Sequence, residues 1–188
     1  MIKLLIYITN HRKLFWVTIF LIYWIVACGY TLYLGDKLPY PDENWYYHEY
    51  GKSIAESGIY SRDGKTPTAY HPPAWPLFIG ILRKFGATIP LVRLINFGFL
   101  FVSLILVYKI VLRYSVIGAM IAVFLGLAYP LLFYTAGTLY PQTFGAFFFL
   151  LGIYLYWFQS LNYKQAILGG LFMGIAILTI PTFLFVLV

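Results

Sequence analysis

The chain has 188 residues, of which 62% are hydrophobic, 21% aromatic and only 10% charged, and its formal net charge is +7. Soluble domains carry about 25% charged residues, so this composition excludes an ordinary soluble domain and predicts a membrane protein. The basic residues stand singly or in pairs at the ends of apolar runs, as topogenic charges do, and form no nucleic-acid-binding face. The single cysteine, Cys28, excludes an internal disulfide.

The N-terminal part predicts a short cytoplasmic tail and a first membrane span. Residues 1–13 carry Lys3, Arg12 and Lys13, and the apolar run 14–34 follows. At about 1.5 Å per residue this run covers the core of a bilayer, and the preceding charges orient it from the cytoplasm outward. A cleaved signal peptide is the alternative, because residues 25–28 resemble a lipobox, but signal cores are typically about 7–15 residues long.

The segment 35–90 is predicted to be a large outer loop with two surface helices. Asp42 follows Pro41 and is predicted to be the N-cap of a helix over about 43–57. A second helix is predicted over 74–85; at about 18 Å it is too short to cross a bilayer, so we expect it to be interfacial or re-entrant. The loop holds every acidic residue of the chain: Asp36, Asp42, Glu43, Glu49, Glu56 and Asp63.

The rest of the chain predicts four more spans. With the first, they give an all-α polytopic membrane protein of about five transmembrane helices in a single membrane domain, 1–188. Lys109, Arg113 and Lys164 then lie on the cytoplasmic side together with the N-terminus. The last run contains Pro181 and ends without a polar flank, which is typical of the front part of a longer protein. The apolar runs are 91–112, 116–133, 142–158 and 166–188.

Several short motifs, in this order and spacing, resemble the N-terminal module of the GT-C glycosyltransferases. The most similar branches are the protein O-mannosyltransferase (family 39-like) and aminoarabinose-transferase-like enzymes, and the resemblance covers nearly the whole chain. It rests on the order of the motifs and not on one strict signature. The motifs are Asp42-Glu43 with Tyr46-Tyr47, then Glu56-Ser57-Gly58-Ile59-Tyr60, His71-Pro72-Pro73-Ala74-Trp75-Pro76, Arg83-Lys84-Phe85-Gly86 and Arg93-Leu94-Ile95-Asn96.

The resemblance implies a reaction and a catalytic residue. Such enzymes transfer a sugar from a polyprenyl- or dolichyl-phosphate donor to an acceptor on the outer face, and the Asp of the Asp-Glu pair acts as general base or contacts a metal. Those roles fall on Asp42, while Glu43 would orient the acceptor. The structural alternatives are a helix cap for Asp42 and a plain first-turn acid for Glu43. Family members are longer than this chain, which leaves acceptor binding open.

Three basic residues are candidate ligands for the donor phosphate. Arg93 lies near the outer end of a predicted span, where a guanidinium can bind phosphate through two N–H groups or snorkel to the interface. Arg83 and Lys84 end the second surface helix, and they either attract the donor phosphate or anchor the helix at anionic headgroups.

Aromatic residues and His71 complete the candidate site. His71 with Asp42, Glu43 and His48 could hold a divalent metal, although no spacing in the chain is a metal signature and a turn residue is the simpler role for His71. Tyr46 and Tyr47, in a cluster with Trp45 and Tyr50, could contact the sugar or belong to an interfacial aromatic belt.

The sequence therefore leaves three hypotheses. The first is a glycosyltransferase in the cell membrane that uses a polyprenyl-phosphate-linked sugar, and the second is a non-catalytic membrane subunit or lipid-linked-sugar binding protein. A channel or transporter comes third, because charges inside the spans are missing beyond Arg93.

Overall fold

The computed structural model describes residues 12–158 and 162–187, and this part of the chain is helical apart from one isolated β-bridge between Ser61 and Pro67. The predicted all-α class is confirmed over these residues. Most of the predicted tail 1–13, including Lys3, and the last residue of the predicted span 166–188 lie outside the described residues.

Two helices are long and apolar enough to cross a membrane: α2 (Arg12–Leu34) and α6 (Ile89–Val111). α7 (Val116–Ala128) and α8 (Pro130–Gly137) meet at a bend of 59° and add a third if the bent pair is one span. The described residues thus hold two or three helices of spanning length. The other two predicted spans correspond to shorter apolar helices, α9 (Gln142–Trp157) and α10 (Tyr163–Thr179).

Two predicted spans are not continuous helices, and a proline explains each break. The run 116–133 breaks at Tyr129 (φ −92°, ψ 102°), whose helical conformation is disfavoured by Pro130. The run 166–188 breaks at the extended Ile180, ahead of Pro181. Beyond it lie a 3₁₀ turn, η2 (Pro181–Phe183), and a short helix, α11 (Leu184–Leu187). The apolar character of the two runs predicted longer helices than those that form, because Pro130 and Pro181 interrupt the helical backbone.

The segment 35–90, which the sequence predicts to be the outer loop, folds into one long helical stretch and one shorter helix, and we call these the outer helices. The stretch comprises α3 (Pro41–Asn44), the π-helix η1 (Trp45–Gly51) and α4 (Lys52–Ser57), and Gly58 ends it with φ 74°. It begins before the predicted 43–57, so Tyr40 is the N-cap and the prediction of Asp42 as the cap is wrong. α5 (Ala74–Lys84) occupies almost the whole of the predicted 74–85.

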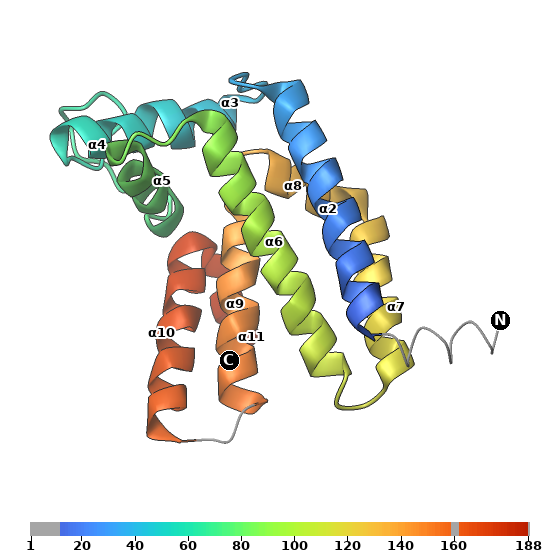
Figure 1. The fold of residues 1–188 in the computed structure, drawn as a ribbon. Coiled ribbons are helices and arrows are strands. Elements are labelled where there is room, and N and C mark those ends of the chain that lie inside the picture. Colours follow the sequence, from blue (N-terminus) through green and yellow to red (C-terminus); the bar gives the residue numbers. More distant parts are fainter. Residues whose placement is uncertain (1–11, 159–161, 188) are drawn as a thin grey trace.

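The long helices form a bundle, and the outer helices lie across one end of it (Figure 1). α6 is central: it packs against α2, α7, α8 and α9, and α9 packs against α10. Gly152 and Gly169 allow the last contact, since a Cβ on Gly152 would lie 3.0 Å from the Gly169 carbonyl oxygen. Basic residues mark the ends away from the outer helices, with Arg12 and Lys13 at the start of α2 and Lys109 in the last turn of α6.

Candidate functional site

Glu43 lies in the interior where the outer helices meet the bundle. Its side chain is fully buried, and its two oxygens accept hydrogen bonds from the backbone N–H groups of Tyr40 and Leu139, each at 3.2 Å. The Arg93 Nη2 lies 3.8 Å from Glu43 Oε1. Burial raises the pKa of the Glu43 carboxyl, and the two N–H donors and Arg93 oppose that rise. The partners of the Glu43 carboxylate are therefore other groups of the protein.

Arg93 is the counterpart of Glu43 and is equally buried. Its two terminal nitrogens donate to the carbonyl oxygens of Gly35 and Lys37, in the segment that leads from α2 to α3. Snorkelling, one of the two predicted roles, does not occur, because none of the side chain is exposed. The guanidinium also has no accessible face for a phosphate in this arrangement. Arg93 therefore links α6 to the segment after α2 and to Glu43.

The peptide group of Leu139 connects these charges to the rest of the outer helices. Its N–H donates to Glu43, and its carbonyl accepts a 2.8 Å hydrogen bond from the indole of Trp75 in α5. Asn96 in α6 donates to the carbonyls around it, including that of Ala136 at 3.0 Å. We call this set the polar joint: Glu43, Trp75, Arg93, Asn96 and Leu139. It fixes α3, α5, α6 and the α8–α9 loop to one another.

Asp42, the neighbour of Glu43, lies near Tyr46 and Tyr140. It is half-buried, and it lies close enough to two tyrosines to affect their titration. Burial, and then the Asp42 carboxylate, raises the pKa of Tyr46 to about 12 and also raises the pKa of Tyr140. Tyr140 in turn packs near Tyr40 and Tyr134, with ring centroids 6.3 and 6.2 Å away. The sequence had predicted no role for Tyr140.

His71 lies among aromatic rings. Its ring centroid is 5.3 Å from that of Tyr46, and burial lowers the pKa of the imidazole while the Asp42 carboxylate opposes this. The neutral form is therefore favoured at pH 7, and it offers one donor and one acceptor. We call Asp42, Tyr46, His71 and Tyr140 the aromatic rim. Further rings around His71 belong to Trp45, Tyr50 and Tyr70, with centroids 4.8–5.8 Å away.

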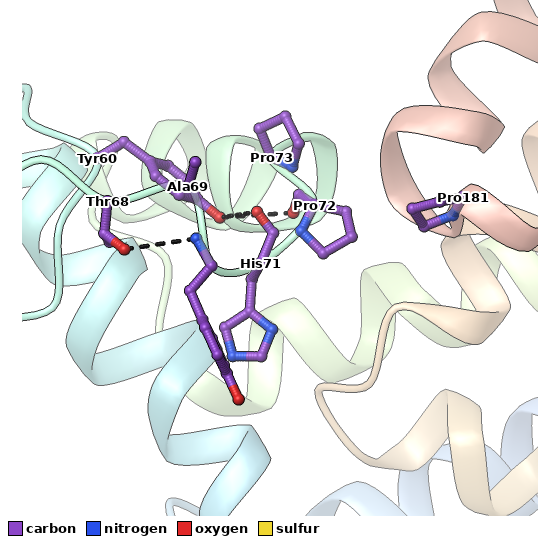
Figure 2. A pocket seen from close by; sticks show the side chains of 8 residues that line it. Tyr60, Thr68, Ala69, His71, Pro72, Pro73 and Pro181 are labelled. Atoms are coloured by element: carbon purple, nitrogen blue, oxygen red, sulfur yellow. Dashed lines mark hydrogen bonds between the residues drawn. The ribbon is translucent and has the colours of Figure 1, made fainter.

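A cavity of about 410 Å³ adjoins the aromatic rim at His71 (Figure 2). His71 and the residues around it form one wall, and Pro181, the first residue of η2, lies across from them. The phenol of Tyr60 donates to the His71 carbonyl at 2.9 Å and shapes this wall. The other lining residues are Thr68, Ala69, Tyr70, Pro72 and Pro73.

A second cavity, of about 530 Å³, runs along the bundle between α2 and the bent pair α7–α8. Its walls are apolar except at one end, where Tyr30 and Tyr134 line it. Tyr134 also packs on Tyr40, at 5.6 Å, and so belongs to the tyrosines beside Asp42. The bend at Tyr129 thus helps to form an apolar groove, and one of its lining residues, Tyr134, packs near Tyr140 of the aromatic rim. The remaining walls are Ile22, Tyr23, Val26, Leu127, Ala128, Pro130 and Phe133.

Arg83 and Lys84, the other predicted phosphate ligands, lie at the end of α5. Arg83 is half-buried; it donates to the Tyr47 carbonyl at 3.0 Å, and its guanidinium lies 4.3 Å from the centre of the Tyr47 ring. Tyr47 is itself buried and donates to the Ala87 carbonyl at 2.9 Å, so it braces α5 instead of facing the aromatic rim. Of the three predicted phosphate ligands, only Lys84 is exposed.

The predicted metal ligands do not gather into a coordination group. Among residues 12–158 and 162–187, no set of three or more His, Cys, Asp or Glu side chains is placed to hold a metal ion. Asp42 and His71 lie near one another, whereas Glu43 is turned into the polar joint and His48 is exposed on η1.

No family model, curated protein or solved structure matches this chain. Functional inference therefore depends on the residues of the aromatic rim, the polar joint and the groove.

Proposed function

We propose that this chain is a GT-C-type membrane glycosyltransferase module, which transfers a sugar from a polyprenyl-phosphate-linked donor to an acceptor on the outer face. One observation carries the proposal: Asp42, half-buried in the first turn of an outer helix, stands beside Tyr140, Tyr46 and His71, and the Tyr140 ring packs near Tyr134, which lines an apolar groove. A carboxylate, polar aromatic groups and a path for a lipid chain are the parts that such a reaction needs.

The chemistry assigned to Asp42 is general-base catalysis. As the acceptor hydroxyl or amine attacks the anomeric carbon, its proton passes to the Asp42 carboxylate, the anomeric C–O bond breaks, and the polyprenyl phosphate leaves with the bonding electrons. Asp42 lies in the first turn of the α3–η1–α4 stretch, and helix N-termini stabilise negative charge. Tyr140 and His71 are placed to hydrogen-bond the sugar or the acceptor beside it.

Glu43 and Arg93 then act as positioning residues. Because Glu43 holds the N–H of Tyr40 and Arg93 holds the segment before it, the backbone that leads into Asp42 is fixed. The donor lipid would lie in the groove between α2 and α7–α8. A divalent metal, if the reaction uses one, would meet Asp42 and His71 first.

The same proposal includes five membrane crossings with a cytoplasmic N-terminus. α9 and α10 have 16 and 17 residues, or about 24–26 Å of helix, which spans a bilayer that is locally thinned. The orientation is supported by the basic residues at the ends of α2, α6 and α10 away from the outer helices, and by the six acids, which all lie in the segment 35–90.

The hydrogen bonds of Arg93 to backbone carbonyls favour a second function. If its engagement by backbone carbonyls persists with lipid bound, the chain has no intramembrane phosphate ligand and acts as a non-catalytic subunit that binds lipid-linked sugar.

Sugar transfer tests the proposal directly. A panel of polyprenyl-phosphate sugars would be offered to the purified protein in lipid nanodiscs, with Asp42→Asn as the variant and Glu56→Gln, an exposed carboxylate of the same helical stretch, as the matched control. We expect transfer by the wild type and by Glu56→Gln, and a loss of about 100-fold or more in Asp42→Asn. Equal rates in all three proteins would overturn the role of Asp42, and binding of donor without transfer in any of them would favour the non-catalytic function.

A further inference from the structure

The outer helix α5 has a face that no other part of the described chain covers. One side of the helix packs inward through Trp75, Ile79 and Gly80, and the Ile54 side chain lies directly against Gly80. On the other side, Leu77, Ile81 and Phe85 are 42%, 53% and 84% exposed. Their spacing of four residues places them on one side of a helix. We call these three residues the apolar stripe.

The position of α5 relative to the bundle indicates what surrounds the apolar stripe. α5 lies below α4 and beside the end of α10, between the outer stretch and the long helices (Figure 1). The chain passes from the end of α5 into α6, a helix of spanning length, within a few residues. The apolar stripe therefore lies close in the chain to the first turn of a helix of spanning length.

The charges next to the stripe are complementary to lipid headgroups. Lys84 is exposed immediately before Phe85, and Arg83 lies half-buried in the same turn, near Lys52 and His48 of the neighbouring stretch. No acidic residue occurs anywhere in residues 64–188, so no carboxylate of α5 or of the following helices offsets these cations. Apolar residues flanked by cations are the pattern of a helix that lies in the surface of an anionic membrane.

We propose that the apolar stripe inserts into the outer leaflet beside the bundle, and that Lys84 together with Arg83 contacts anionic lipid headgroups there. α5 then anchors the outer layer to the membrane and holds it at a fixed height over the spanning helices. This inference is independent of sugar transfer. It applies equally to an enzyme and to a binding subunit.

Depth measurement in bilayers tests the proposal. In a Cys28→Ala background, the full chain carrying Ile81→Cys would be labelled with a small fluorophore and reconstituted in vesicles of phosphatidylcholine with one quarter phosphatidylglycerol. Nitroxides at several acyl-chain positions and a water-soluble quencher would report the depth of the label. Glu56→Cys, exposed on α4, is the matched control.

We expect the Ile81 label to be quenched several-fold more by acyl-chain nitroxides than by the aqueous quencher, and the Glu56 label to show the reverse. We also expect a deeper Ile81 label with phosphatidylglycerol than without it, and loss of that difference in Lys84→Gln. Equal aqueous quenching at both positions would overturn the proposal. A label protected from both quenchers would overturn it too, because protein, such as a second copy of the chain, would then cover the stripe. A depth independent of phosphatidylglycerol would overturn the headgroup contact.

Discussion

Two adjacent carboxylates, Asp42 and Glu43, belong to two different regions of this protein. Glu43 faces the polar joint, where every partner is another group of the chain and none of the side chain is exposed. Asp42 faces the aromatic rim, where it is half-buried among tyrosines and next to His71. Within one turn of helix, successive residues point in different directions, so one acid can fix the structure while its neighbour stays available for chemistry.

The largest effect is expected from removing the cation of the polar joint. Arg93→Met leaves Glu43 buried without its partner and frees the Gly35 and Lys37 carbonyls. We expect the free energy of unfolding in detergent micelles to fall by about 3–5 kcal/mol, as when one member of a buried pair is removed. A loss below about 1 kcal/mol would show that the joint does not hold the outer helices.

A smaller effect is expected from the Trp75 arm of the polar joint. Trp75→Phe keeps a large ring in the core but leaves the buried Leu139 carbonyl without its donor. The free energy of unfolding should fall by about 1–3 kcal/mol. Trp45→Phe, at the half-exposed edge of the aromatic rim, is the control and should change it by less than about 0.5 kcal/mol. Equal losses in the two variants would remove the distinction between joint and rim.

The close contact between Gly137 in α8 and the ring of Tyr30 in α2 offers a steric test. An added Cβ at Gly137, the last residue of α8, would collide with the ring of Tyr30, whereas one at Gly98 would meet open space. Gly137→Ala should therefore lower the unfolding free energy by about 1–2 kcal/mol through overpacking. Gly98→Ala should be neutral or slightly stabilising, because alanine favours helix. Thermal unfolding of both variants in the same detergent would check this, and a neutral Gly137→Ala would contradict the close approach of α2 and α8.

The smallest stability effect concerns pH at the aromatic rim. Burial lowers the pKa of His71 below its ordinary value, so the unfolded chain binds more protons than the folded chain between the two values. His71 therefore contributes stability that is present above about pH 6.5 and is lost as the pH falls from there through the lower pKa of the folded state. Unfolding free energies from pH 7.5 to 5 should decline less steeply in His71→Gln than in the wild type, where His48 contributes in the same sense. Identical slopes would contradict the burial of His71.

Local features were predictable from the sequence because they depend on neighbouring residues. Gly58 ends the outer stretch with a positive φ, and helix α5 begins after Pro73, as local rules for these residue types indicate. The break at Tyr129 was missed because the apolar run 116–133 concealed what Pro130 does to the residue before it. Composition was a better guide to membrane character than to where each helix ends.

The polar joint could not be predicted, for a physical reason. Glu43 and Arg93 both act largely on backbone groups, and Leu139 contributes only its peptide N–H and carbonyl, which every residue type except proline can offer. No residue pattern marks such partners when 96 positions separate Glu43 from Leu139. Arg93 was singled out because an intramembrane charge is costly, but its use could be read only from the packing. Tyr140 was missed because it lies in an uncharged loop far from Asp42 in the chain.

The rate of sugar transfer per folded molecule in Asp42→Asn, set against that in Glu43→Gln, tests the division between the two carboxylates most directly. Asp42→Asn should fold like the wild type, with its unfolding free energy changed by less than about 0.5 kcal/mol, yet transfer about 100-fold more slowly or worse. Glu43→Gln should lose about 1–3 kcal/mol of stability but retain most of the rate in the molecules that remain folded. If Asp42→Asn transfers at the wild-type rate, or if Glu43→Gln is the variant that loses catalysis while staying fully stable, the assignment of chemistry to the rim and of structure to the joint is wrong.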